Sequence, residues 1–341
     1  MSLIINEPEN RINNCIHWYE NFGEWKSIPA NYKSEDGLLT KIFTARSHKT
    51  TGGCNKCHTP YRQFKRVSGK RAFRCKCQKT KVFPLNGTHF ENFKKSLELI
   101  TEILYEITCH KNGVSGLYMF RKYALHTKSA NQMSLRLADW MHWYLLKQVF
   151  ITNSTIEIDE VYPKFNTDLG RFYPWKSGKG SERTHGILVL CERGGLSIAI
   201  AYNKRKKGEI EKIIKELIPV ESDHIIITDE NPEYNFLERS GYEHHAVKHR
   251  KKEYARDEYN TNLDENLNKT IKKSFEFTHN GIYADYIQLY VSRYAFVHCI
   301  RGKGFITIID DLIDSLPPLN QKVQINFKQK NRLKNQYRDA A

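Results

Sequence analysis

The alternation of apolar and polar positions changes character near residue 150. Before that point, residues 34–43 place two acids after Ser34 and then apolar positions at helical spacing, which predicts a short capped helix. Residues 91–150 repeat apolar positions every three to four residues, as amphipathic helices do. A glycine-containing break and a later turn divide this stretch into helices near 115–124 and 127–142, which indicates a helix-turn-helix. A plain helical bundle would give the same pattern.

After residue 150 the pattern consists of short apolar runs that predict strands. The runs 155–162 and 186–201, the second interrupted by a Gly-Gly turn, predict three antiparallel strands in a meander. An amphipathic helix at 208–218 then leads to an apolar strand at 224–228. A meander, a crossover helix and parallel strands together predict a mixed α/β core. Further elements are expected at 232–240 (helix), 245–247 (strand) and 284–297 (helix).

The charge balance narrows the class of partner. The chain has 54 Lys+Arg against 38 Asp+Glu, a formal net charge of +16, which favours a densely negative partner such as the DNA backbone. With 19 Tyr and 17 Phe the chain can build apolar cores, so it is not a disordered basic tail. The sequence shows no apolar run of about 18 residues and no signal-peptide pattern, so we expect a cytoplasmic protein.

Half of the eight cysteines lie close together in the sequence. A CxxC pair and a CxC pair separated by 17 residues predict a zinc ribbon rather than disulfides. Zinc would then replace the hydrophobic core that so short a module cannot build. The CxC pair is one residue shorter than usual, so His58 or His89 is an alternative ligand, and loss of the metal is the other alternative. The four candidate zinc ligands are Cys54, Cys57, Cys75 and Cys77.

Three acidic residues occupy positions suited to binding a pair of Mg²⁺ ions. Asp159 lies within an apolar strand, and Asp229 directly follows another. Glu265 opens a polar helical stretch, and the gaps between the three acids are 69 and 35 residues. Carboxylates at two strand ends and on one helix can converge on two metal ions that promote phosphodiester cleavage. These assignments have competitors among the neighbouring acids, namely Glu157, Glu160, Glu230 and Asp264. Side-chain alternation places Glu157 on the same face of the strand as Asp159 and Glu160 on the opposite face.

These motifs resemble the DDE transposases of bacterial insertion sequences, in particular the ISXO-type group. Ile156–Tyr162 is similar to the group's Val-Glu-Val-Asp-Glu-Thr-Tyr-like strand, and Ile227–Asp229 to its Tyr-Thr-Asp-like segment. Asn260–Glu265, followed by Lys272, is similar to its His-Thr-Asn-x-x-Glu motif, with Asn260 in place of the histidine. The resemblance implies a zinc ribbon, a DNA-binding helical domain and a ribonuclease-H-like catalytic core.

The expected fold class is therefore multidomain α+β and α/β. Its parts are an N-terminal helical segment (1–50), the zinc ribbon (51–90), the helix-turn-helix-like domain (91–150), the ribonuclease-H-like DDE core (151–300) and a basic C-terminal extension (301–341).

Other side chains are expected to assist at the site or to hold DNA. Asn262 lies one turn before Glu265 and either positions a metal-bound water or phosphate or caps the helix. Lys272 lies two turns after Glu265 and either holds a DNA phosphate or is solvated. The basic runs 204–207 and 248–252 are expected to contact the DNA backbone, which adds affinity without sequence information, and a hydrated surface loop is the alternative for each run. The candidate DNA-binding residues are Lys128, Arg136, Lys179, Arg183, Lys248, His249 and Arg250.

The resemblance implies a transposase that binds terminal inverted repeats, cuts the element's ends and joins their 3′-hydroxyls to target DNA. Mg²⁺ or Mn²⁺ on Asp159, Asp229 and Glu265 would serve both steps, and Zn²⁺ would hold the ribbon. A homo-oligomer is implied, because two DNA ends must meet. The alternatives are a non-catalytic zinc-ribbon and helix-turn-helix regulator, and a structure-specific nuclease with the same core.

Overall fold

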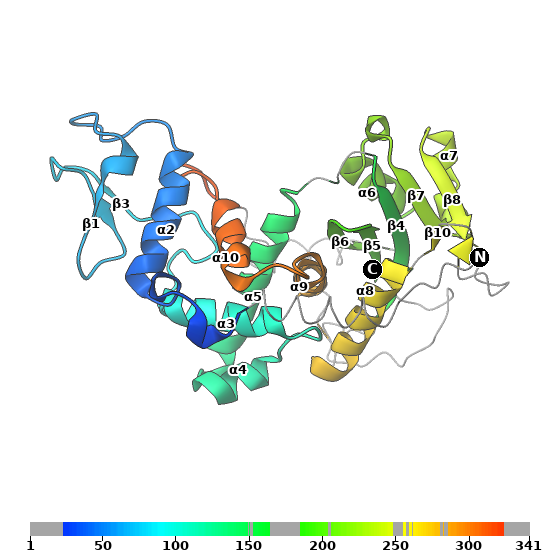
Figure 1. The fold of residues 1–341 in the computed structure, drawn as a ribbon, viewed down its shortest axis with the longest axis horizontal. Coiled ribbons are helices and arrows are strands. Elements are labelled where there is room, and N and C mark those ends of the chain that lie inside the picture. Colours follow the sequence, from blue (N-terminus) through cyan, green and yellow to red (C-terminus); the bar gives the residue numbers. More distant parts are fainter. Residues whose placement is uncertain are drawn as a thin grey trace, which may run out of the picture. The chain divides into compact units, whose positions relative to one another are not determined.

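The chain folds into two compact units, seen in Figure 1. The computed structural model describes residues 23–148, 150, 153–163, 185–203, 206–247, 255–256, 259–260, 262–279, 282 and 286–323. The described part of the first unit lies within Met1–Cys109, Gln132–Trp143 and Ile300–Asn326. That of the second unit lies within His110–Asn131, Tyr144–Cys299 and Phe327–Ala341. None of the described helices is long and apolar enough to cross a membrane.

The first unit has a helical core. Its helix α2 begins after Ser34, whose hydroxyl accepts a hydrogen bond from Gly37 N at 3.2 Å, and two acids follow in the first turn. This is the expected cap, because it satisfies a free N–H group and places negative charge at the positive end of the helix dipole. α2 packs against α3 and α10. The bounds are α2 (Glu35–His48), α3 (Leu97–Cys109), α10 (Phe305–Asp314), η1 (Trp25–Ser27), η2 (Ala30–Tyr32) and η3 (Tyr61–Gln63).

Helix α10 lies within the range expected to be a basic extension, yet it is part of the core of the first unit. Its buried residues follow helical spacing, at positions 305, 308, 309, 312 and 313. Residues 132–143, which belong to helix α5 (Thr127–Leu145), also contribute to this unit. Trp140 Nε1 donates to Leu312 O at 3.0 Å, so the C-terminal helix is tied into the core by a buried hydrogen bond.

A fully buried arginine links distant parts of the first unit. The side chain of Arg46, on α2, is 0% exposed. Its guanidinium donates to the carbonyl oxygens of Asn86 at 2.8 Å, Pro317 at 2.8 Å and Pro318 at 2.9 Å. A buried guanidinium needs such acceptors because desolvation disfavours its charge, and burial lowers the pKa of Arg46 to about 10. One side chain thus joins α2 to two loops far apart in the sequence.

The cysteine module, defined as residues 53–82, is a small antiparallel sheet in the first unit. Its three two-residue strands pair in the order β1-β2-β3. The module packs on α2 through Phe73, whose ring stacks on that of Phe43 with a centroid distance of 3.8 Å. The strands are β1 (Lys65–Arg66), β2 (Phe73–Arg74) and β3 (Lys81–Val82).

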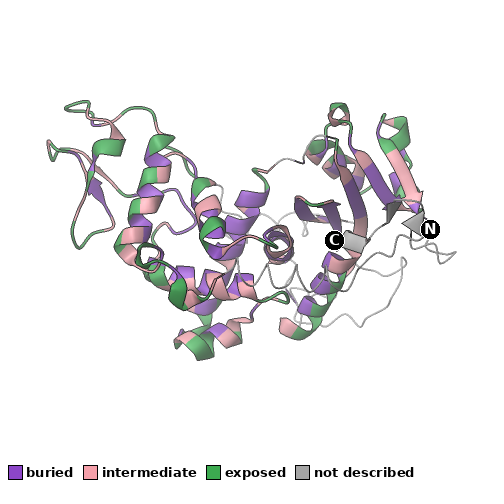
Figure 2. Ribbon diagram, in the orientation of Figure 1, coloured by how far each residue is buried: buried purple, intermediate pink, exposed green. Residues whose placement is uncertain are grey.

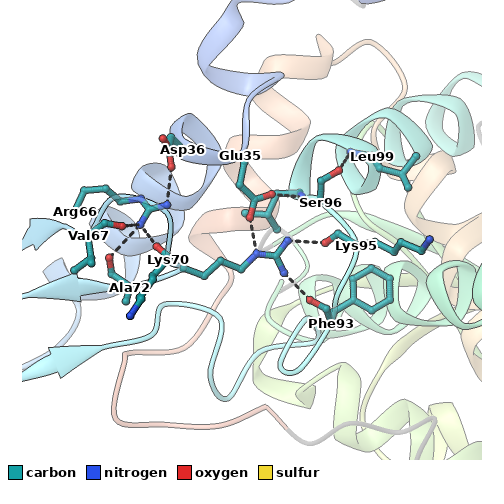
Figure 3. Close-up of polar contacts among 12 residues, drawn as sticks. Glu35, Asp36, Arg66, Val67, Lys70, Ala72, Phe93, Lys95, Ser96 and Leu99 are labelled. Atoms are coloured by element: carbon teal, nitrogen blue, oxygen red, sulfur yellow. Dashed lines mark hydrogen bonds and ion pairs between the residues drawn. The ribbon is translucent and has the colours of Figure 1, made fainter.

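Ion pairs fix the cysteine module to the start of α2, as Figure 3 shows. Arg71 Nε lies 2.5 Å from Glu35 Oε1, and Arg66 Nη2 lies 2.6 Å from Asp36 Oδ1. The other oxygen of Glu35 accepts from Leu97 N, the first residue of α3, at 2.6 Å. The two acids that begin α2 therefore also connect the module and α3 to this helix.

The second unit is built on a five-stranded sheet in the order β6-β5-β4-β7-β8. β4, β5 and β6 are antiparallel, whereas β4, β7 and β8 run parallel. The expected meander followed by parallel strands is therefore confirmed. The central strands are largely buried, as Figure 2 shows. The strands are β4 (Thr155–Val161), β5 (His185–Glu192), β6 (Ser197–Asn203), β7 (Ile225–Asp229) and β8 (Glu243–Val247), and a separate pair is β9 (Ala255–Arg256) and β10 (Tyr259–Asn260).

Local sequence explains the connections around this sheet. The β5–β6 turn has Gly194 at φ 76°, a conformation that glycine adopts without a Cβ clash. α6 crosses from β6 to β7 with Ile210 and Ile214 buried. α8 packs against β4 and β5, and α9 packs against β6 and α8. The remaining elements are α4 (Gly116–Tyr123), α6 (Glu209–Leu217), η4 (Val220–Ser222), η5 (Pro232–Tyr234), α7 (Phe236–Arg239), α8 (Asn262–Lys273), the π-helical η7 (Ser274–Thr278) and α9 (Ile287–Cys299).

Candidate active site

Three carboxylates meet where β4 and β7 lie side by side. These strands are parallel, with Glu157 of β4 opposite Ile227 of β7, so Asp159 and Asp229 come at matching positions along them. One carboxylate oxygen from each of Asp159, Glu160 and Asp229 can be chosen such that all three lie within 4.8 Å of one another. We call these residues the acidic cluster. Oxygen ligands this close are suited to a hard divalent cation such as Mg²⁺.

Hydrogen bonds hold the members of the acidic cluster in place. Asp159 Oδ1 accepts from the Glu160 N–H at 2.8 Å. Asp229 Oδ1 accepts from the Asn231 N–H at 3.0 Å. The amide of Asn231 also donates to Glu160 Oε1 at 3.0 Å, so one residue of the loop after β7 contacts two of the carboxylates. The strands and this loop therefore fix the cluster before any ion binds.

Helix α8 supplies the remaining side chains around Asp159. Asn268 Nδ2 donates to Asp159 Oδ2 at 2.8 Å. Lys272 is exposed one turn later, and its positive charge acts to lower the pKa of Asp159. Glu265 is one turn before Asn268, but its carboxylate pairs with Lys269 at 3.1 Å and is not in the acidic cluster. The structure thus brings together two of the three expected ion ligands and places the third on the same helix face as Asn268.

The electrostatics of the cluster favour the binding of a cation. Burial raises the pKa of Asp159, against the effect of a hydrogen bond from the Glu160 N–H. Burial, with the nearby charges of Asp159 and Asp229, raises the pKa of Glu160 to about 8. These shifts follow from crowding negative charges in a poorly solvated space. A divalent ion would relieve the repulsion between the carboxylates and take the place of a proton on them.

The pattern of the sequence did not reveal all of these residues. Alternation along a strand predicts that Glu160 points away from Asp159, but Glu160 lies at the end of β4 and its longer side chain reaches the cluster. Asn231 and Asn268 were not among the expected site residues. Asn268 lies three residues after Glu265 and four before Lys272, so helical spacing from those two residues was the available signal.

The comparison with known families agrees with this geometry. Residues 152–297, which include the acidic cluster and α8, match the family described as the ISXO2-like transposase domain. The chain therefore contains an ISXO2-like transposase domain. No curated protein and no solved structure matches the chain.

Outside the transposase domain, the four expected zinc ligands come together. Their sulfur atoms lie within 4.8 Å of one another. Cys54 Sγ is 3.4 Å from Cys77 Sγ, and Cys57 Sγ is 3.2 Å from Cys75 Sγ. The hydroxyl of Thr80, followed by backbone N–H groups, lowers the pKa of Cys54 to about 5. A backbone hydrogen bond at Lys79 acts to lower the pKa of Cys77, but the effects of Cys57, of burial and of the other two cysteines together outweigh it and raise this pKa to about 12. A thiolate is the form that binds a metal, so the donor set suits zinc.

The short CxC pair fits because the turn that carries it keeps its normal length. Cys54 N donates to Thr59 O at 2.9 Å, and Cys75 N donates to Thr80 O at 3.0 Å, so both turns close over six residues. The second cysteine is the fourth residue of the first turn but the third residue of the second turn. In both turns the residue after it has a left-handed conformation: His58 at φ 55° in the first and Gln78 at φ 60° in the second. Neither His58 nor His89, both described, belongs to the four-sulfur group.

The candidate DNA-binding residues differ in their exposure and contacts, and some lie outside the described residues. Lys128 is exposed in the first turn of α5. Arg136 contacts the loop before α3, where its guanidinium donates to Glu91 O at 3.3 Å and lies over the ring of Phe93 at 5.1 Å. Those contacts favour a structural role. Asn262 is the first residue of α8. The other candidates lie outside the described residues: Lys179, Arg183, Lys248, His249 and Arg250.

Proposed function

We propose that the protein is a metal-dependent DNA transposase that binds terminal inverted repeats, cuts the ends of its element and joins them to target DNA. The observation that carries the proposal is the acidic cluster at the ends of β4 and β7, within residues that match a transposase domain. The order β6-β5-β4-β7-β8 supports a ribonuclease-H-like core, because that core joins a three-strand meander to parallel strands.

The residues present fit a divalent cation. The donors are all oxygens, and the buried Oδ1 of Asn268 accepts no hydrogen bond from any described residue. Asp159 and Asp229 would hold Mg²⁺ or Mn²⁺ together with Glu265, once Glu265 exchanges its contact with Lys269 for the ion. When bound, such ions activate a water or a 3′-hydroxyl and stabilise the leaving oxygen. Lys272, exposed on the same helix face, would hold the DNA phosphate beside them.

The first unit would anchor the DNA. Zn²⁺ on the four cysteines would make the cysteine module a zinc ribbon. Residues 50–90 contain ten Lys and Arg and no Asp or Glu, and Lys56, Lys76 and Lys79, close in sequence to the cysteines, are exposed. Such a surface contacts phosphates without reading bases, so base recognition falls to the exposed start of α5, around Lys128, which belongs to the second unit. A dimer or larger synapse follows from the need to hold two DNA ends.

The proposal is tested with labelled DNA that carries the repeats flanking the gene. Wild type is expected to cut at a defined end with Mg²⁺, and Asp229→Asn to lose at least about 100-fold in rate while still binding, because a charged ligand is gone. Asp223→Asn is the matched control, because Asp223 is exposed just before β7 at φ 50°, a conformation that asparagine tolerates.

Two outcomes contradict the proposal. Specific binding without cutting, with both Mg²⁺ and Mn²⁺, would indicate a DNA-binding regulator. Cutting of branched DNA with no preference for the repeats would indicate a structure-specific nuclease.

A further inference from the structure

Asn268 occupies an unusual position for a polar side chain. It lies on the face of α8 that packs against β4, and the residue is only 4% exposed. Its Nδ2 donates to Asp159 Oδ2 at 2.8 Å. Its Oδ1 is buried and accepts no hydrogen bond from any described residue. An unsatisfied buried acceptor destabilises the fold, so packing alone does not account for an amide here.

The amide completes the support of one carboxylate. Oδ1 of Asp159 is held by the N–H of Glu160 at 2.8 Å, and Oδ2 is held by Asn268. The two donors come from different elements, a strand and a helix, so they fix the plane of the carboxylate and the place of α8 relative to β4. A lysine at 268 would also hold Asp159, but its charge would compete with the cation. A neutral amide orients the carboxylate and leaves its charge intact.

The same contact links the acidic cluster to the face of α8 that carries Glu265 and Lys272. Glu265 precedes Asn268 by three residues and Lys272 follows it by four, so the three side chains lie on one face of the helix. Fixing Asn268 against Asp159 therefore also sets how far Glu265 must move to reach the cluster.

We propose that Asn268 is a positioning residue that holds Asp159, and with it α8, in the geometry required for ion binding. This inference rests on the proposed function. Hydrogen-bonding partners of metal ligands commonly change metal affinity by 10- to 100-fold when they are removed.

The test measures Mn²⁺ affinity of the DNA-free full chain by electron paramagnetic resonance. Asn268→Ala and the isosteric Asn268→Asp are both expected to bind Mn²⁺ about tenfold more weakly than wild type, because each loses the donor. Asn266→Ala is the matched control: it removes the same amide on the same helix, but Asn266 contacts Lys111 at 2.9 Å instead of the cluster. At saturating Mn²⁺, DNA cleavage by Asn268→Ala should approach that of wild type, which a merely structural defect would not allow.

Thermal unfolding in EDTA shows whether each variant is folded. If Asn268→Ala does not fold, the Mn²⁺ affinity of Asn268→Asp still tests the inference. Wild-type Mn²⁺ affinity in Asn268→Ala would overturn the inference. Tighter Mn²⁺ binding by Asn268→Asp than by wild type would also overturn it and make the residue an ion ligand. If wild type binds Mn²⁺ no better than Asp159→Asn, the metal site itself, and so the proposed function, has failed.

Discussion

A second group of buried ionisable side chains lies in the first unit. His89 Nδ1 is 3.2 Å from Asp139 Oδ2, and both side chains are almost completely buried. His142 is buried nearby, one turn after Asp139 on α5. Burial lowers the pKa of His142 to about 4, with Asp139 acting in the opposite direction and His89 in the same one. His142 therefore stays neutral in the folded protein where a free histidine is charged.

The stability of the first unit should fall on acidification. Between pH 6.5 and 4 the unfolded chain binds a proton at His142 and the folded chain does not, so the free energy of unfolding decreases as the pH falls. The full effect is about 3 kcal/mol, reached near pH 4. His142→Gln should flatten this slope in denaturant titrations at several pH values. His48→Gln, which alters an exposed histidine of the same unit, should leave the slope unchanged. An equal slope in His142→Gln would contradict the assignment.

Some of the individual site residues could be predicted from the sequence, and others could not. Asp159 could be predicted because a charged side chain inside an apolar strand is costly unless it has a function or a partner. Glu160 could not, because alternation describes Cβ directions and not the reach of a longer side chain at a strand end. Arg136 resembled a DNA contact because a basic residue on a helix gives no sign of which loop carbonyls the fold brings to it.

Among the elements, the cysteine module depends most on its neighbours. Its strands are two residues long, and its attachments include the Phe43–Phe73 stack, the ion pairs to Glu35 and Asp36, and hydrogen bonds from Arg71 to the carbonyl groups of Phe93 and Lys95. A sheet of this size has too small a core to be stable alone, and zinc at the four cysteines would stabilise it.

Removing zinc should unfold the cysteine module and leave the transposase domain folded. A strong chelator is expected to open residues 53–82 to proteolysis, because zinc bound to the four cysteines would supply on the order of 10 kcal/mol. Cys77→Ser should give the same cleavage without a chelator and contain less zinc. Cys109→Ser is the control, because Cys109 is not in the four-sulfur group. An unchanged proteolysis pattern after complete zinc removal would show that the module does not need the metal.

Sequence periodicity predicted the long elements better than the short ones. α2 and α6 lie where apolar spacing predicted helices, α8 coincides with the expected polar helical stretch, and the meander follows its apolar runs. α10 was not expected, because Ile306, Thr307, Ile308 and Ile309 are β-branched and favour strands, although its apolar positions keep helical spacing. The two-residue strands of the cysteine module are too short to show a period. Their pairing depends on the turns between the cysteines.

For the whole molecule, the net charge of +16 should make DNA binding strongly dependent on salt. Each neutralised phosphate contributes a slope of about −0.9 in log K against log salt, because bound counterions are released. Replacing Lys56, Lys76 and Lys79 with alanine should weaken binding to all sequences similarly and reduce the slope by up to about 3. Lys212→Ala, on α6, should have little effect, because this lysine already pairs with Glu216. A slope unchanged by the triple substitution would remove the cysteine module from the DNA interface.

The buried contacts of Arg46 can be completed only late in the synthesis of the protein. Ribosomes release the chain from its N-terminus, so α2 and the cysteine module leave the exit tunnel long before the carbonyl groups of Pro317 and Pro318. Residues 152–297, which match the transposase domain, emerge in between. A nascent or prematurely terminated chain that stops near residue 300 would thus contain all the residues that match the transposase domain, while its first unit would still lack α10 and the carbonyl groups of Pro317 and Pro318 that accept hydrogen bonds from Arg46.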